Sequence, residues 1–362
     1  MALGLLTLSI LGLGATPVNG QTTFRVASMN VSLYGDRAGE VKQKLAGGSD
    51  AKAINLAKVI NQVQPDVLLL CEIDHDADGS TLDAFADGYL NGAYPYRWSI
   101  PTNTGVLADV DINGDGKRYL PVDAWGFGKY PGQYAMSVLS KFPIDQAAIR
   151  TFQEFRWADL PEALRPIDPV SGEPYHSDSV WKKLRLSSKN HVDVPIEVEV
   201  GGKTQALHLL ASHPTPPVFD GKEDRNGKRN HDEIRFWIEY ISNANAGYLV
   251  DDSGVAGGLP SDASFVIAGD LNSDPNSGDS IRSAIANLIS HERVNDVEPK
   301  SDAHGIATAL FGRRQVRVDY VLPSSDLSVV ASEVVWPVDG QVLGKAVQAT
   351  DHRMVWVDIS LE

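Results

Sequence analysis

One arrangement recurs along the chain: a carboxylate, an amide or an imidazole stands beside the end of an apolar run. In the clearest case, the apolar residues 265–267 are followed by Gly269, Asp270, Leu271 and Asn272. An apolar run stopped by Gly, Asp and Asn is typical of a buried strand that enters a loop. Because alternate residues of a strand project from one face, Asp270 and Asn272 can address one water molecule or phosphate oxygen together.

Gly, Asp and Asn also favour turns for purely local reasons, so this motif alone leaves a simple turn as an equal interpretation. The same arrangement recurs, however, beside other expected strands, at Asn30, Glu72, His213 and the pair Asp351–His352, while Asp319 lies inside a strand. Carboxylates and histidines placed in this way are what metal-assisted hydrolysis needs. The carboxylates supply hard oxygen ligands for Mg²⁺ or Mn²⁺, and the imidazoles transfer protons.

The elements that must position these groups follow from the apolar pattern. Residues 50–63 have helical spacing, and Gly201–Gly202 joins two strands in hairpin fashion. Cys71, the only cysteine, follows the apolar run Val67–Leu70 and is expected in the core. Strands are expected at 24–29, 65–72, 135–140, 196–200, 204–211, 265–267, 316–322 and 354–359, and further helices from 232 and at 281–289.

At 362 residues the chain is long enough for one large domain, with long loop insertions at about 102–134, 154–181 and 214–231. The apolar run 5–13 and the small residues before Gln21 predict a signal peptide at 1–20, although no Lys or Arg follows Met1. We therefore expect a secreted or periplasmic protein. No later segment reaches roughly 18 uncharged apolar residues, so integral membrane contact is not expected.

The formal net charge of −15 disfavours avid, sequence-independent binding to nucleic acid, which is expected at most as a substrate. No obligate protein partner is predicted. A bound divalent cation would still allow an acidic site to accept a phosphate ester.

Two groups in the insertions are further candidates. Asp111, Asn113 and Asp115 match the opening of a calcium loop, but its twelfth position is Val122, so a structural Ca²⁺ and a solvated acidic turn both stay open. In the polar segment before residue 232, Arg225, Arg229 and His231 are candidates for contact with a substrate phosphate, since guanidinium groups pair with phosphate oxygens. The alternative for this segment is structural, with Asn230 capping the helix that follows.

Taken together, six short motifs resemble those of the endonuclease/exonuclease/phosphatase superfamily, which includes deoxyribonuclease I, apurinic endonucleases, inositol-polyphosphate phosphatases and bacterial sphingomyelinases. The resemblance covers about residues 24–359 and points to a secreted bacterial-type member. It implies a four-layer α/β sandwich, in which two packed mixed β-sheets are flanked by helices, and a metal-dependent phosphoesterase. The motifs are Ser28–Asn30, Leu70–Glu72, Ser212–Pro214, Gly269–Asn272, Arg317–Tyr320 and Thr350–Arg353.

The resemblance also implies roles for individual residues. Glu72 is similar to the principal metal ligand of the family, with Asn30 and Asp351 near the same ion. Asp270 would orient or deprotonate the attacking water, and Asn272 would hold that water or a phosphate oxygen.

By the same resemblance, His352 would stabilise the charge that develops on phosphorus or act as an acid or base. Asp319 would fix the tautomer and orientation of His352. His213 matches the second histidine of the nuclease and sphingomyelinase branches, which favours the extracellular branches of the family.

The expected function is hydrolysis of phosphodiesters or small phosphate esters by in-line attack of an activated water. The alternative is a secreted deoxyribonuclease, and a third interpretation is a noncatalytic binding protein with the same fold. A sphingomyelinase would need exposed aromatic loops at a membrane, for which Trp157 and Trp181 are the candidates.

Overall fold

The computed structural model describes residues 22–361, and the predicted signal peptide lies outside the described residues. Its first sheet has six strands, of which β1 and β2 are parallel and the other neighbours antiparallel. The long strand β1 is central, and it carries Asn30. The strand order is β12 (Ser328–Val334), β13 (Val355–Leu361), β1 (Thr22–Leu33), β2 (Val67–Ile73), β4 (Ala135–Ser140), β3 (Tyr96–Ile100).

The second sheet has five strands, and its only parallel pair is β7 with β8. Gly201 and Gly202, with φ of 57° and 78°, make the tight turn between β6 and β7 that the sequence predicts. The strand order is β11 (Asp319–Pro323), β8 (Phe265–Asp270), β7 (Lys203–Ser212), β6 (His191–Val200), β5 (Arg150–Thr151). A separate hairpin joins β9 (Ala309–Phe311) to β10 (Arg314–Val316).

The inner faces of the two sheets pack against each other, because alternate residues of facing strands are apolar and buried. Val26 and Leu69 of the first sheet share this core with Val194 and Leu209 of the second. Cys71 also lies in this core, as predicted.

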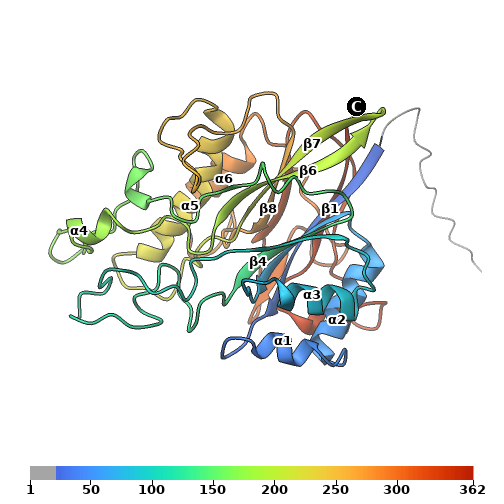
Figure 1. The fold of residues 1–362 in the computed structure, drawn as a ribbon, viewed down its shortest axis with the longest axis horizontal. Coiled ribbons are helices and arrows are strands. Elements are labelled where there is room, and N and C mark those ends of the chain that lie inside the picture. The colour runs from blue at the N-terminus through green and yellow to red at the C-terminus, as the bar shows by residue number, and fades with distance from the viewer. Residues whose placement is uncertain (1–21, 362) are drawn as a thin grey trace, which may run out of the picture.

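Helices cover the two outer faces, as Figure 1 shows. On the first sheet lie α1 (Glu40–Leu45), α2 (Ala51–Val63) and α3 (Ser80–Tyr89), and on the second α5 (Arg225–Ser242) and α6 (Ser283–Ile289). Asp50 caps α2 by accepting a hydrogen bond from the Ala53 N–H, as expected from its residue type. The order of layers is helix, sheet, sheet, helix, so the predicted four-layer α/β sandwich is confirmed.

Two of the three predicted insertions hold little regular structure, whereas the third, 214–231, ends inside α5, which begins at Arg225. Residues 102–134 contain only isolated bridges, and 154–181 contains the 3₁₀ turn η1 (Trp157–Asp159) and the one-turn helix α4 (Asp178–Trp181). A second 3₁₀ turn, η2 (Ala346–Ala349), precedes the Asp351–His352 motif. Within residues 22–361, no helix is both long and apolar enough to cross a bilayer.

Candidate active site

Neighbouring strands of the two sheets bring three of the predicted residues together. Asn30 of β1 donates from Nδ2 to Oε1 of Glu72 on β2 at 3.1 Å and to Oδ2 of Asp270 on β8 at 3.0 Å. Asn30 and Asp270 are both buried. One amide of the first sheet thus bridges a carboxylate of each sheet, which sets the spacing of the two acids.

The backbone at this edge is held in unusual conformations. Glu72 and Asn272 have φ of 59° and 52°, in the left-handed region that side chains other than glycine seldom adopt. Gly269 has a φ of 153°, and a Cβ there would lie 1.9 Å from the carbonyl oxygen of Ser212. Only glycine permits this approach, which brings the end of β7 beside Asp270.

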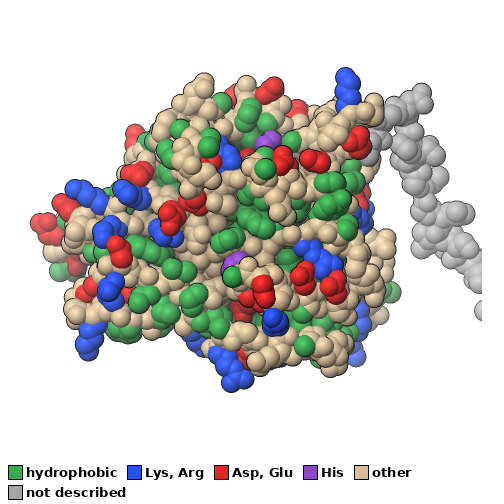
Figure 2. All heavy atoms as spheres, in the orientation of Figure 1, with side chains coloured by type: hydrophobic (Ala, Val, Ile, Leu, Met, Phe, Trp, Pro, Cys, Tyr) green, Lys and Arg blue, Asp and Glu red, His purple; other side chains and the backbone are tan. Residues whose placement is uncertain are grey.

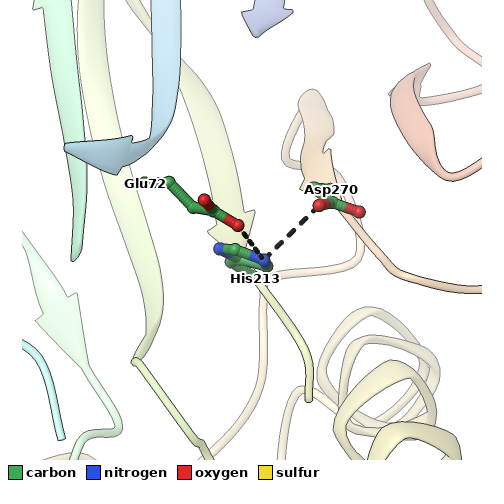
Figure 3. A group of neighbouring side chains, drawn as sticks. All are labelled: Glu72, His213 and Asp270. Atoms are coloured by element: carbon green, nitrogen blue, oxygen red, sulfur yellow. Dashed lines mark ion pairs between the residues drawn. The ribbon is translucent and has the colours of Figure 1, made fainter. Parts of the chain in front are cut away.

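His213 follows β7 and completes a triangle with the two acids, as Figure 3 shows. Its Nε2 lies 3.4 Å from Oδ2 of Asp270 and 4.0 Å from Oε1 of Glu72. The residue is only 2% exposed, and neither ring nitrogen has a hydrogen-bond partner among the described residues. A buried imidazole without a protein partner is available to a water molecule or a cation.

His352 lies on the other side of Asp270. Its Nδ1 is 2.9 Å from Oδ2 of Asp319, and its Nε2 is 3.7 Å from Oδ2 of Asp270. Asp319 begins β11 and pairs with Asp270 across the antiparallel strands, so the sheet fixes both acids around the imidazole. The guanidinium of Arg353 donates to the carbonyls of Val347, Thr350 and His352 and thereby secures the loop that carries the histidine.

The two histidines differ in protonation. Burial would lower the pKa of His352, but Asp319 and Asp270 outweigh it and raise the pKa to about 10. For His213, burial and the charges of Lys189 and His352 lower the pKa well below its usual range. Burial raises the pKa of Asp270 to about 6. At neutral pH, therefore, His352 is protonated, His213 is neutral and Asp270 is mostly ionised.

The donor set fits a divalent cation. One ligand atom each from Glu72, His213 and Asp270 lies within 4.8 Å of the others, and both nitrogens of His213 are free. Carboxylate oxygens are the ligands that Mg²⁺ and Mn²⁺ prefer. A second group of possible ligands consists of Asp270, Asp319 and His352. Within it, Asp319 and His352 are already hydrogen-bonded to each other.

Three predicted residues at this edge have other contacts. The amide of Asn30 directs its N–H donors toward the acids, while its Oδ1 accepts from the Ser32 N–H, so it bridges the two acids, and its role as a metal ligand stays a prediction. Asn272 donates to the carbonyl of Pro214 at 3.1 Å and fixes the loop of His213. Asp351 is half exposed at the rim, with Oδ1 4.0 Å from Nε2 of His352, and its role as a metal ligand stays a prediction.

The predicted phosphate contacts of α5 need correction. The helix begins at Arg225, so Asn230 lies inside it and is not its cap. Arg229 is half-buried, and it donates to the carbonyls of Trp125, Arg185 and Leu186, which gives it a structural role. Arg225 pairs with Glu223, and His231 contacts Asp232 and Ser283; neither joins the carboxylate–histidine cluster.

The acidic loop at 111–115 is held by its own backbone. Asp111 accepts from the N–H groups of Gly114 and Gly116, Asn113 accepts from Asp115, and Asp115 accepts from Lys117 and the Tyr119 hydroxyl. These contacts explain the turn without an ion, and calcium binding there stays a prediction. Trp157 is buried, with its indole N–H bonded to Asp232, so it is not an exposed membrane contact.

Sequence reasoning missed Lys189. The residue is 6% exposed and lies between Ser188, which bonds Glu233, and Asn190, which bonds the carbonyl of Pro101. Burial lowers its pKa, while Glu233, Glu72 and Asp270 act in the opposite direction, so its charge lies near the acids of the site. The signal that could have found it is register: His191 pairs with Ser212, which puts the segment just before β6 opposite His213.

Fold and site together define a class: a four-layer sandwich with a carboxylate–histidine centre at one edge of its paired sheets. Comparison with known families places the chain within that class. A model of the Endonuclease/Exonuclease/phosphatase family matches residues 27–352, and the protein belongs to this family. Its members hydrolyse phosphate esters, and the protein is a phosphoester hydrolase. A search of curated proteins found no match.

Solved structures share the fold at low sequence identity. An endonuclease/exonuclease/phosphatase from Beutenbergia cavernae is 17% identical, with a TM-score of 0.56 over 94% of this chain and 72% of its own. A family protein from Bacteroides thetaiotaomicron is 13% identical, with a TM-score of 0.52 over 94% and 99%. The catalytic domain of human Nocturnin, with a bound sulfate anion, is 13% identical, with a TM-score of 0.50 over 94% and 97%.

Proposed function

We propose that the protein is a secreted phosphoesterase that depends on Mg²⁺ or Mn²⁺ and hydrolyses phosphodiesters or small phosphate esters. The observation that carries this proposal is the cluster of Glu72, His213 and Asp270 beside the pair Asp319–His352. A cation bound at Glu72, Asp270 and His213 would neutralise negative charge on the phosphoryl oxygens.

The residues of the chain divide the remaining work. Asp270, ionised at neutral pH, orients the attacking water and accepts its proton. His352 holds a proton on Nε2, directed at the space beside Asp270, and donates it to a phosphoryl oxygen or to the leaving group. Asp319 accepts the hydrogen bond of the opposite nitrogen, Nδ1, and so keeps the ring turned with Nε2 toward Asp270.

Lys189 adds a positive charge next to the acids. Because its charge lies near these acids, its ammonium is placed to bind an anionic ester oxygen. A buried ammonium interacts with such an oxygen more strongly than an exposed one, since less water screens the pair.

The alternative is a secreted deoxyribonuclease. Net charge does not favour it, and on the face shown in Figure 2 the Lys and Arg side chains lie singly among acidic ones and form no continuous stripe. A duplex needs several phosphate contacts at once, so we favour small esters and phosphodiesters.

The test is hydrolysis by the purified protein of bis-p-nitrophenyl phosphate, p-nitrophenyl phosphate and plasmid DNA, each with Mg²⁺, Mn²⁺ or Ca²⁺ and with EDTA. We expect turnover of the small esters that EDTA abolishes, with the plasmid left largely intact. Rapid nicking of plasmid with slow turnover of the small esters would instead make the protein a nuclease. Turnover that survives EDTA would contradict the metal dependence.

A further inference from the structure

The ring of His213 makes no hydrogen bond to the described residues. Both ring nitrogens lack partners among the described residues, yet the residue is buried and its Nε2 points at the two acids. The orientation therefore depends on the packing around the ring and on the backbone that carries it, which lies in a loop after β7.

Glu233 of α5 binds this loop and a second one with a single carboxylate. Its Oε1 accepts from the Ser188 N–H and its Oε2 from the Thr215 N–H, both at 2.6 Å. Ser188 directly precedes Lys189, and Thr215 lies two residues after His213. Hydrogen bonds to a carboxylate are stronger than those between neutral groups. Glu233 therefore fixes the segment that carries Lys189 relative to the segment that carries His213.

Asn230, one turn earlier on the same helix, ties the His213 loop to the Asp270 loop. Its Nδ2 donates to the carbonyls of Thr215 and Leu271, both at 2.9 Å, and Leu271 directly follows Asp270. Asn272 returns a bond from its own amide to the carbonyl of Pro214 at 3.1 Å. The loops that follow β7 and β8 are thus joined by hydrogen bonds from both Asn230 and Asn272.

These polar residues are unusual for their position in the helix. Asn230 and Glu233 are 0% and 1% exposed, on a helix that also buries Asp232 and packs Ile234 and Trp237 against the sheet. Burying an amide and a carboxylate costs free energy that apolar side chains would not. All of the side-chain bonds of both residues go to the backbone of segments that flank Lys189, His213 and Asp270, so what they supply is the geometry of the site.

We propose that Glu233 and Asn230 are positioning residues of the active site, which set the direction of His213 and the place of Lys189 from behind the sheet. Neither touches the reacting atoms. This proposal builds on the proposed function, but it concerns where the His213 ring lies and can be tested without turnover.

The test compares Glu233→Gln with wild type in two measurements. The amide keeps the size of the side chain but turns an N–H donor toward one of the two backbone N–H groups. With bis-p-nitrophenyl phosphate and Mg²⁺, we expect kcat to fall by about 10- to 100-fold while KM changes by less than about threefold. In histidine-labelled NMR spectra of the metal-free protein, we expect the His213 ring signal to shift while that of His304 does not.

The matched control is Glu239→Gln, the same change on the same helix, where the side chain contacts Arg235 and Tyr248. We expect it to leave kcat and the His213 signal as in wild type. A Glu233→Gln protein with unchanged kcat and an unmoved His213 signal would overturn the proposal, and so would a loss of kcat without a shift of that signal.

A second variant covers the possibility that Glu233→Gln does not fold. Asn230→Ala removes the amide, whose hydrogen bonds to the described residues are the two that Nδ2 donates. Its expected effects are the same in direction, so unchanged kcat and an unmoved His213 signal would again overturn the proposal. If the wild-type protein hydrolyses no ester, the proposed function fails, and the His213 signal alone then decides the positioning role.

Discussion

The pair of histidines shows how single residues set the chemistry. Asp319 and Asp270 keep His352 protonated, while burial near Lys189 and His352 keeps His213 neutral. One histidine can therefore give a proton at the same pH at which the other has free nitrogens for a ligand.

Asp319→Asn tests this assignment at the residue scale. The amide keeps the shape but removes the charge that orients and protonates His352, so kcat should fall by about 10² to 10⁴-fold, as for other carboxylates that orient a catalytic imidazole. The measurement is initial rates on bis-p-nitrophenyl phosphate, with the exposed Asp302→Asn as the control. A kcat within about twofold of wild type would show that Asp319 does not orient and protonate His352 for catalysis.

Individual residues also mark the limit of what sequence can predict. Glu72, His213, Asp270, Asp319 and His352 could be found because each lies beside an apolar strand. Lys189, Glu233 and Asn230 could not be assigned, since their meaning depends on which loop each one faces, and that is set by the register of β6 on β7 and by the rotation of α5.

At the scale of elements, the close approach of β7 and β8 keeps His213 near Asp270. Gly269→Ala would place a Cβ 1.9 Å from the Ser212 carbonyl oxygen, so the two strands would have to separate. We expect a loss of about 3 kcal/mol in unfolding free energy and most of the activity.

Urea unfolding followed by circular dichroism measures that change. Gly247→Ala is the control, because a Cβ there meets nothing within 4 Å. Equal stability of the two variants would show that the approach of β7 to β8 is not constrained in this way.

His191, at the start of β6, predicts how the stability of the folded protein depends on pH. Burial lowers the pKa of His191 to about 3, although its Nε2 donates to the backbone carbonyl of Glu233. The unfolded chain, with a histidine pKa near 6.5, binds this proton more readily than the folded protein does. The contribution of His191 to the free energy of unfolding is therefore fully present above about pH 6.5 and is lost as the pH falls below that value.

His191→Gln isolates this contribution. From pH 7 to pH 5, wild type should lose about 2 kcal/mol of unfolding free energy more than the variant does, because only wild type must exclude the proton. Urea titrations at both pH values measure the difference. Parallel losses in the two proteins would show that His191 does not titrate in this range.

Helices and strands could be predicted where the spacing of their apolar residues was regular, and could not be predicted elsewhere. Helix 50–63 and the hairpin at Gly201–Gly202 agree with the structure. The start of α5 does not, because its first two turns bury Gly227 and Asn230 in place of apolar residues. Read as a loop, that segment made Arg229 look free for a phosphate, whereas three backbone carbonyls surround it.

At the scale of the molecule, the four-layer fold could be predicted because the six motifs resemble one family in order and type across the chain. The conformations of the insertions could not be predicted, since their sequences carry no period. Substrate choice depends on such loops, which is why the fold alone does not name the ester.

The central claim is that Glu72, His213 and Asp270 form the catalytic centre, and Glu72→Gln tests it most directly. The measurement is the rate of bis-p-nitrophenyl phosphate hydrolysis as Mg²⁺ is increased, compared with wild type and with the exposed control Glu197→Gln. We expect the folded variant to lose at least about 10³-fold in kcat/KM at every Mg²⁺ concentration, while the control keeps the wild-type rate. A folded Glu72→Gln protein that hydrolyses the ester as fast as wild type would contradict the account.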